Sequence, residues 1–466
     1  MSPSLSESNR DRPAGHGTGS ALGERTMRKV RRRILPIVVV LYLIAYLDRN
    51  NVGFAKSGLA HDLGINDAAY GLGAGIFFIG YTLMEVPSNG GMYRFGARKW
   101  MARILITWGI LAVAMALVSG ETSFYIVRFL LGAAEAGFFP AVLFYFTLWF
   151  PTSYRVAALG VFVLAQPLAN AIGSPISGLV LNLDGVWGMH GWQWMFLIEG
   201  VPAIVFGILT PLLLTDKPAD ARWLTSEERA WLAETMAGED AARRTTARRP
   251  FVAGLKDPRA LVYGLLNFGM VCGIYGLGLW LPTIVNGLGH FSSTELGLLV
   301  MIPYAVSLPC VYFWSKRADR TGRRAWHAAV SMGVAAVGLL LAGLLFSVSP
   351  VVALIMLSVS AIGIYSAIAP FLAMPSFVLA GATAAAALGV VNSLGNIGGF
   401  VSPYVVGLIK SATGSNQVAL AFLAACLAVT GLIVYAYGRN RPEGNASAAI
   451  PVAAGTSGID DGKEAV

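Results

Sequence analysis

Charged residues are scarce in this chain. Only 13% of its 466 residues are Asp, Glu, Lys or Arg, whereas 56% are hydrophobic. A soluble globular protein carries about 25% charged residues. The composition therefore excludes an ordinary soluble protein and predicts an integral membrane protein.

Cysteine and histidine are also rare. Cys272, Cys310 and Cys426 lie in apolar runs without metal-ligand or disulfide spacing, so we interpret them as small buried apolar residues. The five histidines show no metal or catalytic spacing. Because the chain also lacks a sizeable cytoplasmic domain, these absences argue against a metal site, a membrane enzyme and a non-transporting sensor.

Long apolar runs, by contrast, are abundant. A bilayer core requires about 20 apolar residues per helix, and twelve runs approach or exceed that length. The first six cover about 34–55, 69–92, 101–118, 123–147, 156–180 and 194–214. The second six cover about 259–285, 294–314, 326–346, 350–378, 384–409 and 416–438. The sequence predicts an all-α membrane protein with twelve transmembrane helices in two six-helix halves.

The runs divide the chain into five expected parts. These are a disordered basic tail (1–33), an N-terminal half (34–214), a linker (215–258), a C-terminal half (259–438) and a second disordered tail (439–466). The start of the chain is polar and lacks the apolar core of a signal peptide. Within the linker, Thr225–Glu228 is a capping box that predicts a short amphipathic helix, TSEERAWLAETM.

Arginine and lysine are distributed unevenly among the loops. They gather before the first run and after the second and eighth, whereas the opposite loops carry little beyond Lys56 and Lys410. The positive-inside rule then places both termini and the linker in the cytoplasm. Membrane orientation thus accounts for the net charge of +9, and we expect no nucleic-acid partner.

Two loops in equivalent places of the halves share a motif. Tyr93–Lys99 reads YRFGARK after the second run, and Asp319–Arg324 reads DRTGRR after the eighth. A tight glycine turn with flanking arginines suits a short cytoplasmic loop whose cations meet carboxylates or lipid phosphates. The candidate motif residues are Arg94, Gly96, Arg98, Asp319, Arg320, Gly322 and Arg323.

Six charged residues fall inside the predicted spans and away from their ends. There each charge costs about 2.5–3.5 kcal/mol even on the lenient insertion scale. We interpret Glu85 as a structural pair near the cytoplasmic loop and Glu199 as a cap or a helix-to-helix hydrogen bond. The remaining four are Asp48, Arg49, Arg128 and Glu135.

These four charges can meet. At about 1.5 Å of rise per residue, Asp48, Arg49 and Arg128 share a depth of roughly 8–10 Å below the outer edge. Glu135 follows Arg128 by nearly two turns, so both project from one face with Glu135 about 10 Å deeper. We expect all four to face one cavity. They would act either as static salt bridges or as pairs that exchange partners when an anion and a proton bind.

Uncharged polar residues are expected to line the same cavity. Phenol and amide groups without partners are costly in hydrocarbon, so they must face a partner, water or substrate. The candidates are Tyr46, Tyr81, Gln166, Asn170, Asn392 and Asn396. We interpret Tyr275 and Trp280 on the seventh span as packing residues or interface anchors.

Five segments carry a resemblance to a known family: YLDRNNVGFA, YTLMEVPSN, RFLLGAAEAGFFP, WQWMFLIEGVPA and VNSLGNIGGFVSPYVVG. With the repeated loop motif, they resemble the anion:cation symporters of the major facilitator superfamily. Within that family they look most like bacterial permeases for tartrate, phthalate, hydroxyphenylacetate and related carboxylates. The chain departs from the loop signature at Tyr93, where an Asp is expected, and at Ser315, where a Gly is expected.

This resemblance implies the superfamily's twelve-helix fold and proton-coupled uptake of a small organic carboxylate across the inner membrane. It also implies a monomer that uses the proton gradient and needs no cofactor. It assigns proton coupling to Asp48 and Glu135 and anion contacts to Arg49 and Arg128. The implied substrate-lining positions are Tyr46, Tyr81, Gln166 and Asn392.

An efflux antiporter for organic anions or drugs is the alternative. Such antiporters of the superfamily often carry a Gly-Pro-rich signature late in the fifth span. Here Gly173–Gly178 reads GSPISG, with Ser174 where a glycine would stand. We take this departure to favour uptake.

Overall fold

The computed structural model describes residues 16–246, 257–378 and 384–439, which are almost entirely helical and contain no strand. The N-terminal helices are α1 (His16–Leu63), α2 (Asp67–Phe95), α3 (Ala97–Ala114), α4 (Glu121–Glu135), α5 (Phe138–Trp149), α6 (Thr152–Val180) and α7 (Gly191–Leu213). The linker contains α8 (Ser226–Thr246). The C-terminal helices are α10 (Pro258–Asn286), α11 (Ser293–Thr321), α12 (Arg324–Leu344), α13 (Pro350–Val378), α14 (Ala384–Thr413) and α15 (Asn416–Arg439). Short 3-10 turns occur at Met115–Leu117, Leu181–Leu183, Val186–Gly188 and Pro218–Asp220.

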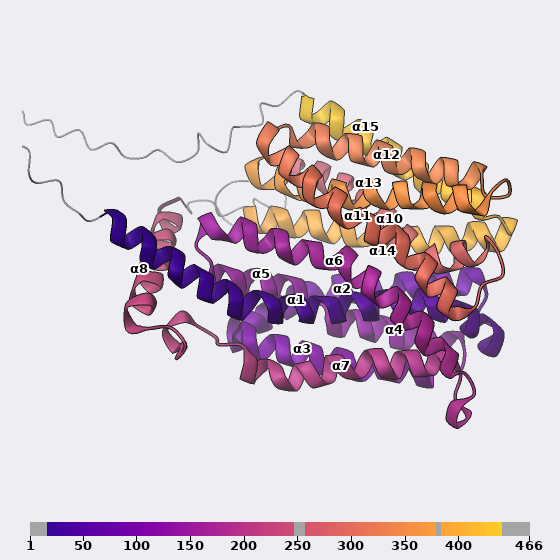
Figure 1. The fold of residues 1–466 in the computed structure, drawn as a ribbon, viewed down its shortest axis with the longest axis horizontal. Coiled ribbons are helices and arrows are strands. Elements are labelled where there is room, and N and C mark those ends of the chain that lie inside the picture. Colours follow the sequence, from indigo (N-terminus) through magenta and orange to yellow (C-terminus); the bar gives the residue numbers. More distant parts are fainter. Residues whose placement is uncertain (1–15, 247–256, 379–383, 440–466) are drawn as a thin grey trace, which may run out of the picture.

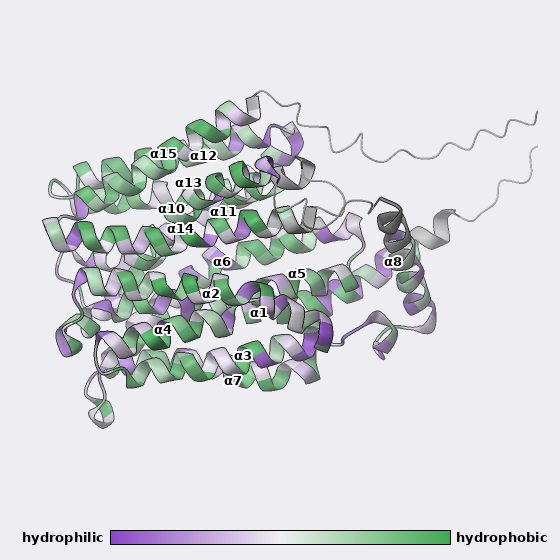
Figure 2. Ribbon diagram, turned by 180° about the vertical axis from the view of Figure 1, so that it is seen from behind, coloured by the Kyte–Doolittle hydropathy of each residue, from purple (hydrophilic) through white to green (hydrophobic). Residues whose placement is uncertain are grey.

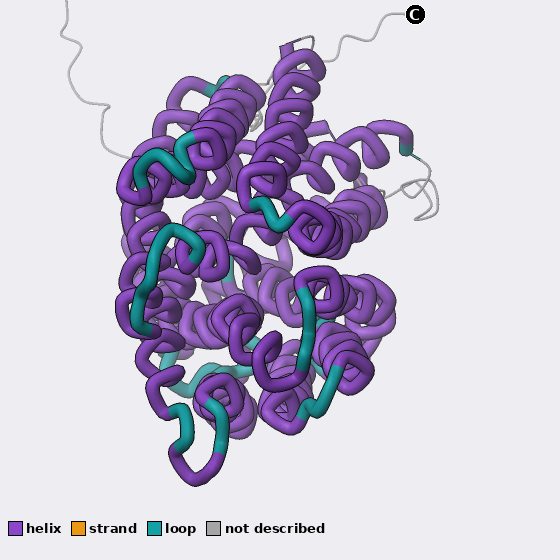
Figure 3. The backbone as a smooth tube through the Cα atoms, turned by 90° about the vertical axis from the view of Figure 1, so that its right-hand side faces the viewer, coloured by secondary structure: helices purple, strands orange, loops and turns teal. Residues whose placement is uncertain are grey.

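The helices form two bundles of nearly parallel rods that lie side by side (Figure 1). One bundle contains α1–α7 and the other α10–α15, while α8 lies at one end, next to the start of α1. Hydrophobic residues cover most of the rods, and hydrophilic residues gather on α8 and near the rod ends (Figure 2). Viewed along the rods, one bundle is stacked on the other, and short loops join helices at the end that faces the viewer (Figure 3).

The predicted spans agree largely with these helices. Among the described residues, ten helical segments are long and apolar enough to cross a membrane. They include every predicted span except the first and the eleventh, which lie in α1 and α14. The all-α class is confirmed, and the count of twelve spans stays a prediction. The tails 1–15 and 440–466 and the linker segment 247–256 lie outside the described residues.

The fourth predicted span, 123–147, is not one continuous helix. α4 ends at Glu135 and α5 begins at Phe138, on either side of Gly137 with its φ of +89°. A positive φ favours glycine, and Pro140 lacks the N–H that a continuous helix needs there. The break places the Glu135 carboxylate at a helix end inside the span.

The two halves touch at the ends predicted to face outward. A Cβ on Gly71 of α2 would lie 3.0 Å from the Cα of Gly407 of α14. At a second crossing, a Cβ on Gly178 of α6 would lie 2.9 Å from the Cα of Gly297 of α11. Small residues let helix backbones approach this closely. The halves are therefore closed against each other at this end.

Residues 16–33, predicted to belong to a disordered tail, instead form the first turns of α1. Val30 is fully buried there, and Lys29 Nζ lies 2.8 Å from Glu228 Oε1 of α8. α8 follows the predicted capping box, because the Thr225 N–H donates to Glu228 Oε2 and the Glu228 N–H donates to Thr225 Oγ1. The tail prediction failed because this helix is stabilised by a partner about 200 residues away in the chain.

Both copies of the loop motif form the predicted glycine turn. Gly96 has a φ of +85° at the end of α2, and Gly322 has a φ of +69° at the end of α11. The flanking cations Arg94 and Arg320 are exposed, and Arg323 is the N-cap residue of α12. The turns thus present basic groups at the loop surface.

The two copies use different carboxylates. In the first, where Tyr93 replaces the expected acid, Arg98 Nε lies 2.9 Å from Asp216 Oδ2, which follows α7. In the second, Arg324 Nη2 lies 3.7 Å from Asp319 Oδ1 within the motif itself. Asp216, which the sequence analysis missed, therefore supplies the carboxylate that position 93 lacks.

We expect the Glu228 carboxylate to stabilise the contact between α1 and α8. Burial raises the pKa of Glu228, but the bonds from Lys29 and Thr225 outweigh it and hold that pKa below its ordinary value. A lowered pKa contributes stability that is present at neutral pH and is lost as the pH falls through the lowered value. Glu228→Ala should cost about 1–2 kcal/mol at neutral pH, because it removes both the cap and the partner of Lys29.

The rate of trypsin cleavage in the linker measures this contact. Glu228→Gln is the matched control, because a Gln at this position still completes a capping box. Trypsin should cleave Glu228→Gln more slowly than Glu228→Ala. The difference in cleavage rate between the wild type and the variants should become smaller in acid. Equal cleavage of the wild type and both variants at neutral pH would contradict the expectation.

Candidate functional site

A buried ion pair joins α1 to the broken fourth span. Arg49 Nη2 donates to Glu135 Oε1, and Arg49 Nη1 donates to the Tyr275 hydroxyl of α10 at 2.8 Å. The Glu135 side chain is 1% exposed and that of Arg49 is 11% exposed. Because an unpaired charge is costly at such a depth, each ion stabilises the other.

Aromatic rings surround the Arg49 guanidinium. Its Cζ lies 5.0 Å from the ring centroid of Tyr46, 5.3 Å from that of Phe77 and 5.6 Å from that of Tyr81. Cation–π contacts of this length contribute about 0.5–2 kcal/mol each, more where water is excluded. They compensate in part for lost hydration without neutralising the charge, so Arg49 remains available to an anion.

A cavity of about 140 Å³ lies beside the ion pair. Residues of α1, α2, α4, α5 and α6 line it from one half, and residues of α10, α13 and α14 line it from the other. Apolar side chains are mixed with a few convergent polar groups, as in sites that bind small molecules. The cavity therefore has the composition and the position, between the halves, of a substrate site.

Six of the eight residues predicted for substrate and proton binding line this cavity: Tyr46, Arg49, Tyr81, Glu135, Gln166 and Asn392. Tyr275 also lines it, so its interpretation as a packing residue was wrong, whereas Trp280 packs edge-on against Tyr70 as interpreted. The position of Tyr275 in the sequence argues against an interface anchor, because such anchors lie near span ends, whereas Tyr275 lies in the middle of its helix. Asn267 was missed, since one isolated amide forms no pattern.

Asp48 and Arg128 do not line the cavity, so the expectation that all four charges face it was wrong. Trp108 Nε1 of α3 donates to Asp48 Oδ2 at 2.6 Å, and Arg128 Nε donates to the Gly73 carbonyl at 3.3 Å. Successive helical residues point about 100° apart, so Asp48 faces away when Arg49 faces the cavity. In the described part of the chain, no ion pair joins Asp48 to a basic side chain.

Arg128 nevertheless lies close to the cavity. The ring centroid of Phe77 is 4.9 Å from Arg128 Cζ and 5.3 Å from Arg49 Cζ. Arg128 is fully buried, and both hydrogen bonds from its guanidinium go to backbone carbonyls of α2. Both guanidinium groups therefore contact the Phe77 ring, and of the two only Arg49 lines the cavity.

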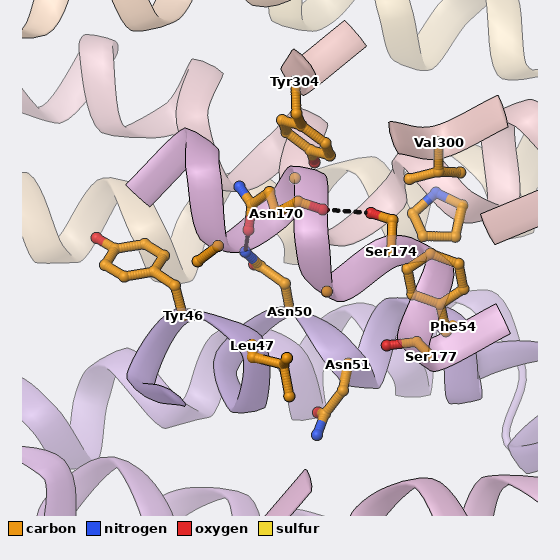
Figure 4. A pocket seen from close by; sticks show the side chains of 14 residues that line it. Tyr46, Leu47, Asn50, Asn51, Phe54, Asn170, Ser174, Ser177, Val300 and Tyr304 are labelled. Atoms are coloured by element: carbon orange, nitrogen blue, oxygen red, sulfur yellow. Dashed lines mark hydrogen bonds between the residues drawn. The ribbon is translucent and has the colours of Figure 1, made fainter. Parts of the chain in front are cut away.

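A smaller cavity of about 20 Å³ lies beyond Tyr46, which lines both cavities. The Asn50 amide donates there to Asn170 Oδ1 at 2.5 Å (Figure 4). Asn170 in turn donates to the Tyr365 hydroxyl at 2.9 Å. Gln166 and Asn170, predicted to share one helix face, reach different cavities because four residues separate them by about 6 Å along the axis. The amides connect α1 and α6 to α13 of the other half.

The two remaining intramembrane acids hold helices together. Ser177 Oγ of α6 donates to Glu199 Oε1 of α7 at 2.7 Å, which confirms the predicted helix-to-helix bond. Glu85 of α2 accepts a hydrogen bond from Asn392 of α14 and a longer one, of 3.4 Å, from Asn396. Glu85 therefore joins the two halves, rather than forming a pair near the cytoplasmic loop.

The chain matches a known family over most of its length. A family model described as Major Facilitator Superfamily matches residues 38–403, with a second match over 281–455. The chain belongs to the Major Facilitator Superfamily. Membership confirms the predicted family and the helical membrane fold. It also confirms the prediction that the protein is a transporter rather than an enzyme.

Similar proteins support this assignment. The chain is 44% identical to a protein of Agrobacterium vitis named "Putative tartrate transporter", over 91% of this chain and 93% of that protein. It is 43% identical to the "Quinolone resistance transporter" of Acinetobacter baumannii, over 88% of this chain and 93% of that protein. Among solved structures, a D-xylose-proton symporter is similar with a TM-score of 0.70 at 16% identity, over 88% of this chain and 97% of that one. At that identity the likeness concerns the fold alone.

We expect the protein to be destabilised when one charge of the Arg49–Glu135 ion pair is removed, and much less when both are removed. Arg49→Met should destabilise the protein by about 3–5 kcal/mol, because it leaves the Glu135 carboxylate buried without its cation. The double variant Arg49→Met/Glu135→Gln should recover most of that loss, since no lone charge remains. Thermal unfolding in detergent measures both, and a double variant as unstable as the single one would contradict the expectation.

Proposed function

We propose that this transporter is a proton-coupled importer of a small organic carboxylate, such as tartrate, a sugar acid or an aromatic carboxylate. The main support is the position of Arg49, a buried guanidinium with one carboxylate partner, facing a cavity lined by both halves. A guanidinium can bind a carboxylate through two parallel N–H···O bonds. An incoming anion therefore competes with Glu135 for the same donors.

Exchange of partners couples the anion to a proton. When the anion binds Arg49, the Glu135 carboxylate loses its cation and stays in a water-poor site. A lone buried carboxylate is costly, so it takes a proton from the water on the side to which the cavity is open. A monoanion and a proton then occupy the site together, and the net charge of the site does not change.

The other predicted residues support this exchange. Asp48 is 2% exposed and bonds to Trp108 and Asn51, so it would serve as a second proton site on the α3 side of α1. Arg128, which contacts the same Phe77 ring as Arg49, adds positive charge close to the cavity. The hydroxyl and carboxylate groups of the substrate would bond to Tyr46, Tyr81, Gln166 and Asn392.

Alternating access follows from a site between two halves. A rocking motion of one half against the other exposes such a site to one side at a time. The contacts of Gly71 with Gly407 and of Gly178 with Gly297 keep the predicted outer end closed here. We further propose a monomer in the inner membrane, with cytoplasmic termini, driven by the proton gradient without a cofactor.

An efflux antiporter for organic anions or drugs is the second candidate. The observation in its favour is the 43% identity to the protein named "Quinolone resistance transporter". In an antiporter the proton enters as the substrate leaves. Transport direction in inside-out vesicles separates the two candidates, because only the antiporter accumulates substrate when the lumen is acidified.

Proteoliposome uptake under a pH gradient tests the proposal. A panel of tartrate, a sugar acid and phthalate identifies the substrate class. For the accepted acid, Glu135→Gln and Asp48→Asn should each lower gradient-driven uptake about tenfold or more, equivalent to at least about 1.4 kcal/mol of lost coupling. Exchange of labelled for unlabelled acid, which needs no net proton movement, shows that each variant still binds. Full gradient-driven uptake by both variants would disprove proton coupling through these acids.

A further inference from the structure

Among the described residues, no cation forms an ion pair with the buried carboxylate of Glu85. Its side chain is 7% exposed, and its described partners are the amides of Asn392 and Asn396. Neither amide is charged, so neither neutralises the carboxylate. A buried carboxylate without a counter-ion is stable only if its donors are well placed or if it holds a proton. Glu85 therefore depends on these two amides.

Glu85 lies at the edge of the main cavity. Tyr81, one turn earlier on α2, and both amides line the cavity, whereas Glu85 does not. The described hydrogen-bond partners of Glu85 on α14 are the two amides, and the cavity-lining residues of α13 are apolar. The titratable or charged groups that line the cavity are Tyr42, Tyr46 and Arg49 of α1, Tyr81 of α2, Glu135 of α4 and Tyr275 of α10.

The same hydrogen bonds hold the halves together. Gly71 and Gly407 fix α2 against α14 at the predicted outer end. Glu85 lies about 21 Å further along α2, by the rise of a helix, where it bonds to Asn392. Separation of the halves at this level must break the bond between Glu85 and Asn392.

A substrate anion would compete for this contact. Asn392 lines the cavity and is a proposed substrate ligand, yet its amide is already bonded to Glu85. An anion that draws the amide away removes a donor from Glu85 and brings a second negative charge close to it. Both changes favour the protonated carboxyl over the carboxylate.

We propose that Glu85 is a further proton-binding residue of the transport cycle, loaded when anion binding draws the Asn392 amide away from it. The proton comes from water on the side to which the cavity is open and forms an O–H bond on the Glu85 carboxyl, with no other covalent change. The neutral carboxyl then lets α2 and α14 separate without leaving a bare charge between them. This inference rests on the proposed function, because an anion must enter the cavity.

Proton stoichiometry in proteoliposomes tests the inference, with the full chain and labelled tartrate as the probe. With the membrane potential clamped at zero, the final accumulation ratio changes about tenfold per co-transported proton for each pH unit of gradient, which corresponds to about 1.4 kcal/mol. Glu85→Gln keeps an acceptor for Asn392 but cannot bind a proton. It should lower the ratio about tenfold at a gradient of about one pH unit.

Two variants serve as controls. Glu85→Asp restores a titratable carboxyl and should bring the ratio back toward that of the wild type. Glu199→Gln makes the same chemical change at a buried acid whose donor, Ser177, belongs to the same half and does not line the main cavity, so it should leave the ratio at the wild-type value. A merely structural role for Glu85 would lower the rate of tartrate exchange without changing the final ratio.

The outcomes separate this inference from the proposed function. A wild-type ratio in Glu85→Gln overturns the role of Glu85 and leaves proton-coupled uptake intact. A wild-type protein that does not accumulate tartrate or another acid of the panel under the gradient overturns both. If Glu85→Gln fails to reconstitute, Asn396→Ala is the second test. Loss of one donor to the carboxylate should shift the pH midpoint of tartrate affinity upward, and an unchanged midpoint overturns the inference.

Discussion

The cost of burying charge is the constraint on which this structure depends. The buried charge of Arg49 is stabilised in two ways, by the carboxylate of Glu135 and by the faces of three aromatic rings. These contacts keep a full positive charge inside the bundle, next to a cavity, without a second anion. The positive charge is therefore stabilised but not enclosed, as the proposed binding of an anion requires. The acids without a cation, Asp48, Glu85 and Glu199, are instead held by hydrogen-bond donors of neighbouring helices.

The break in the fourth span belongs to the same arrangement. Gly137 and Pro140 end one helix and begin another, so Glu135 sits at a helix terminus, where its carboxylate meets Arg49. Transporters commonly place discontinuous helices at the membrane midplane, where free backbone groups face a cavity. Here the interruption lies between the helix that carries the ion pair and the one that carries Phe138 and Phe139 on the cavity wall.

The contacts between the halves are of a kind that can be broken and remade. The intramembrane ion pair Arg49–Glu135 lies within one half. Across the halves, the structure has glycine contacts at the outer end and hydrogen bonds deeper in, from Arg49 to Tyr275, from Asn170 to Tyr365 and from Asn392 to Glu85. Such bonds contribute about 0.5–1.5 kcal/mol each when neutral and about 1.5–3 kcal/mol when charged. The halves can therefore separate without splitting the Arg49–Glu135 ion pair.

The sequence by itself determined the membrane class, the division into two halves, the loop motif and the family, because each rests on composition or on a local pattern. It also located ten of the spans to within a few residues. The tertiary structure decided what each helix faces. Depth counting fixes a residue along the helix axis but not the rotation of the helix, which is set by packing against helices distant in the chain. For that reason Arg49 rather than Asp48 faces the cavity, Tyr275 joins it, Glu85 bonds across the halves, and the predicted tail is a helix held by α8.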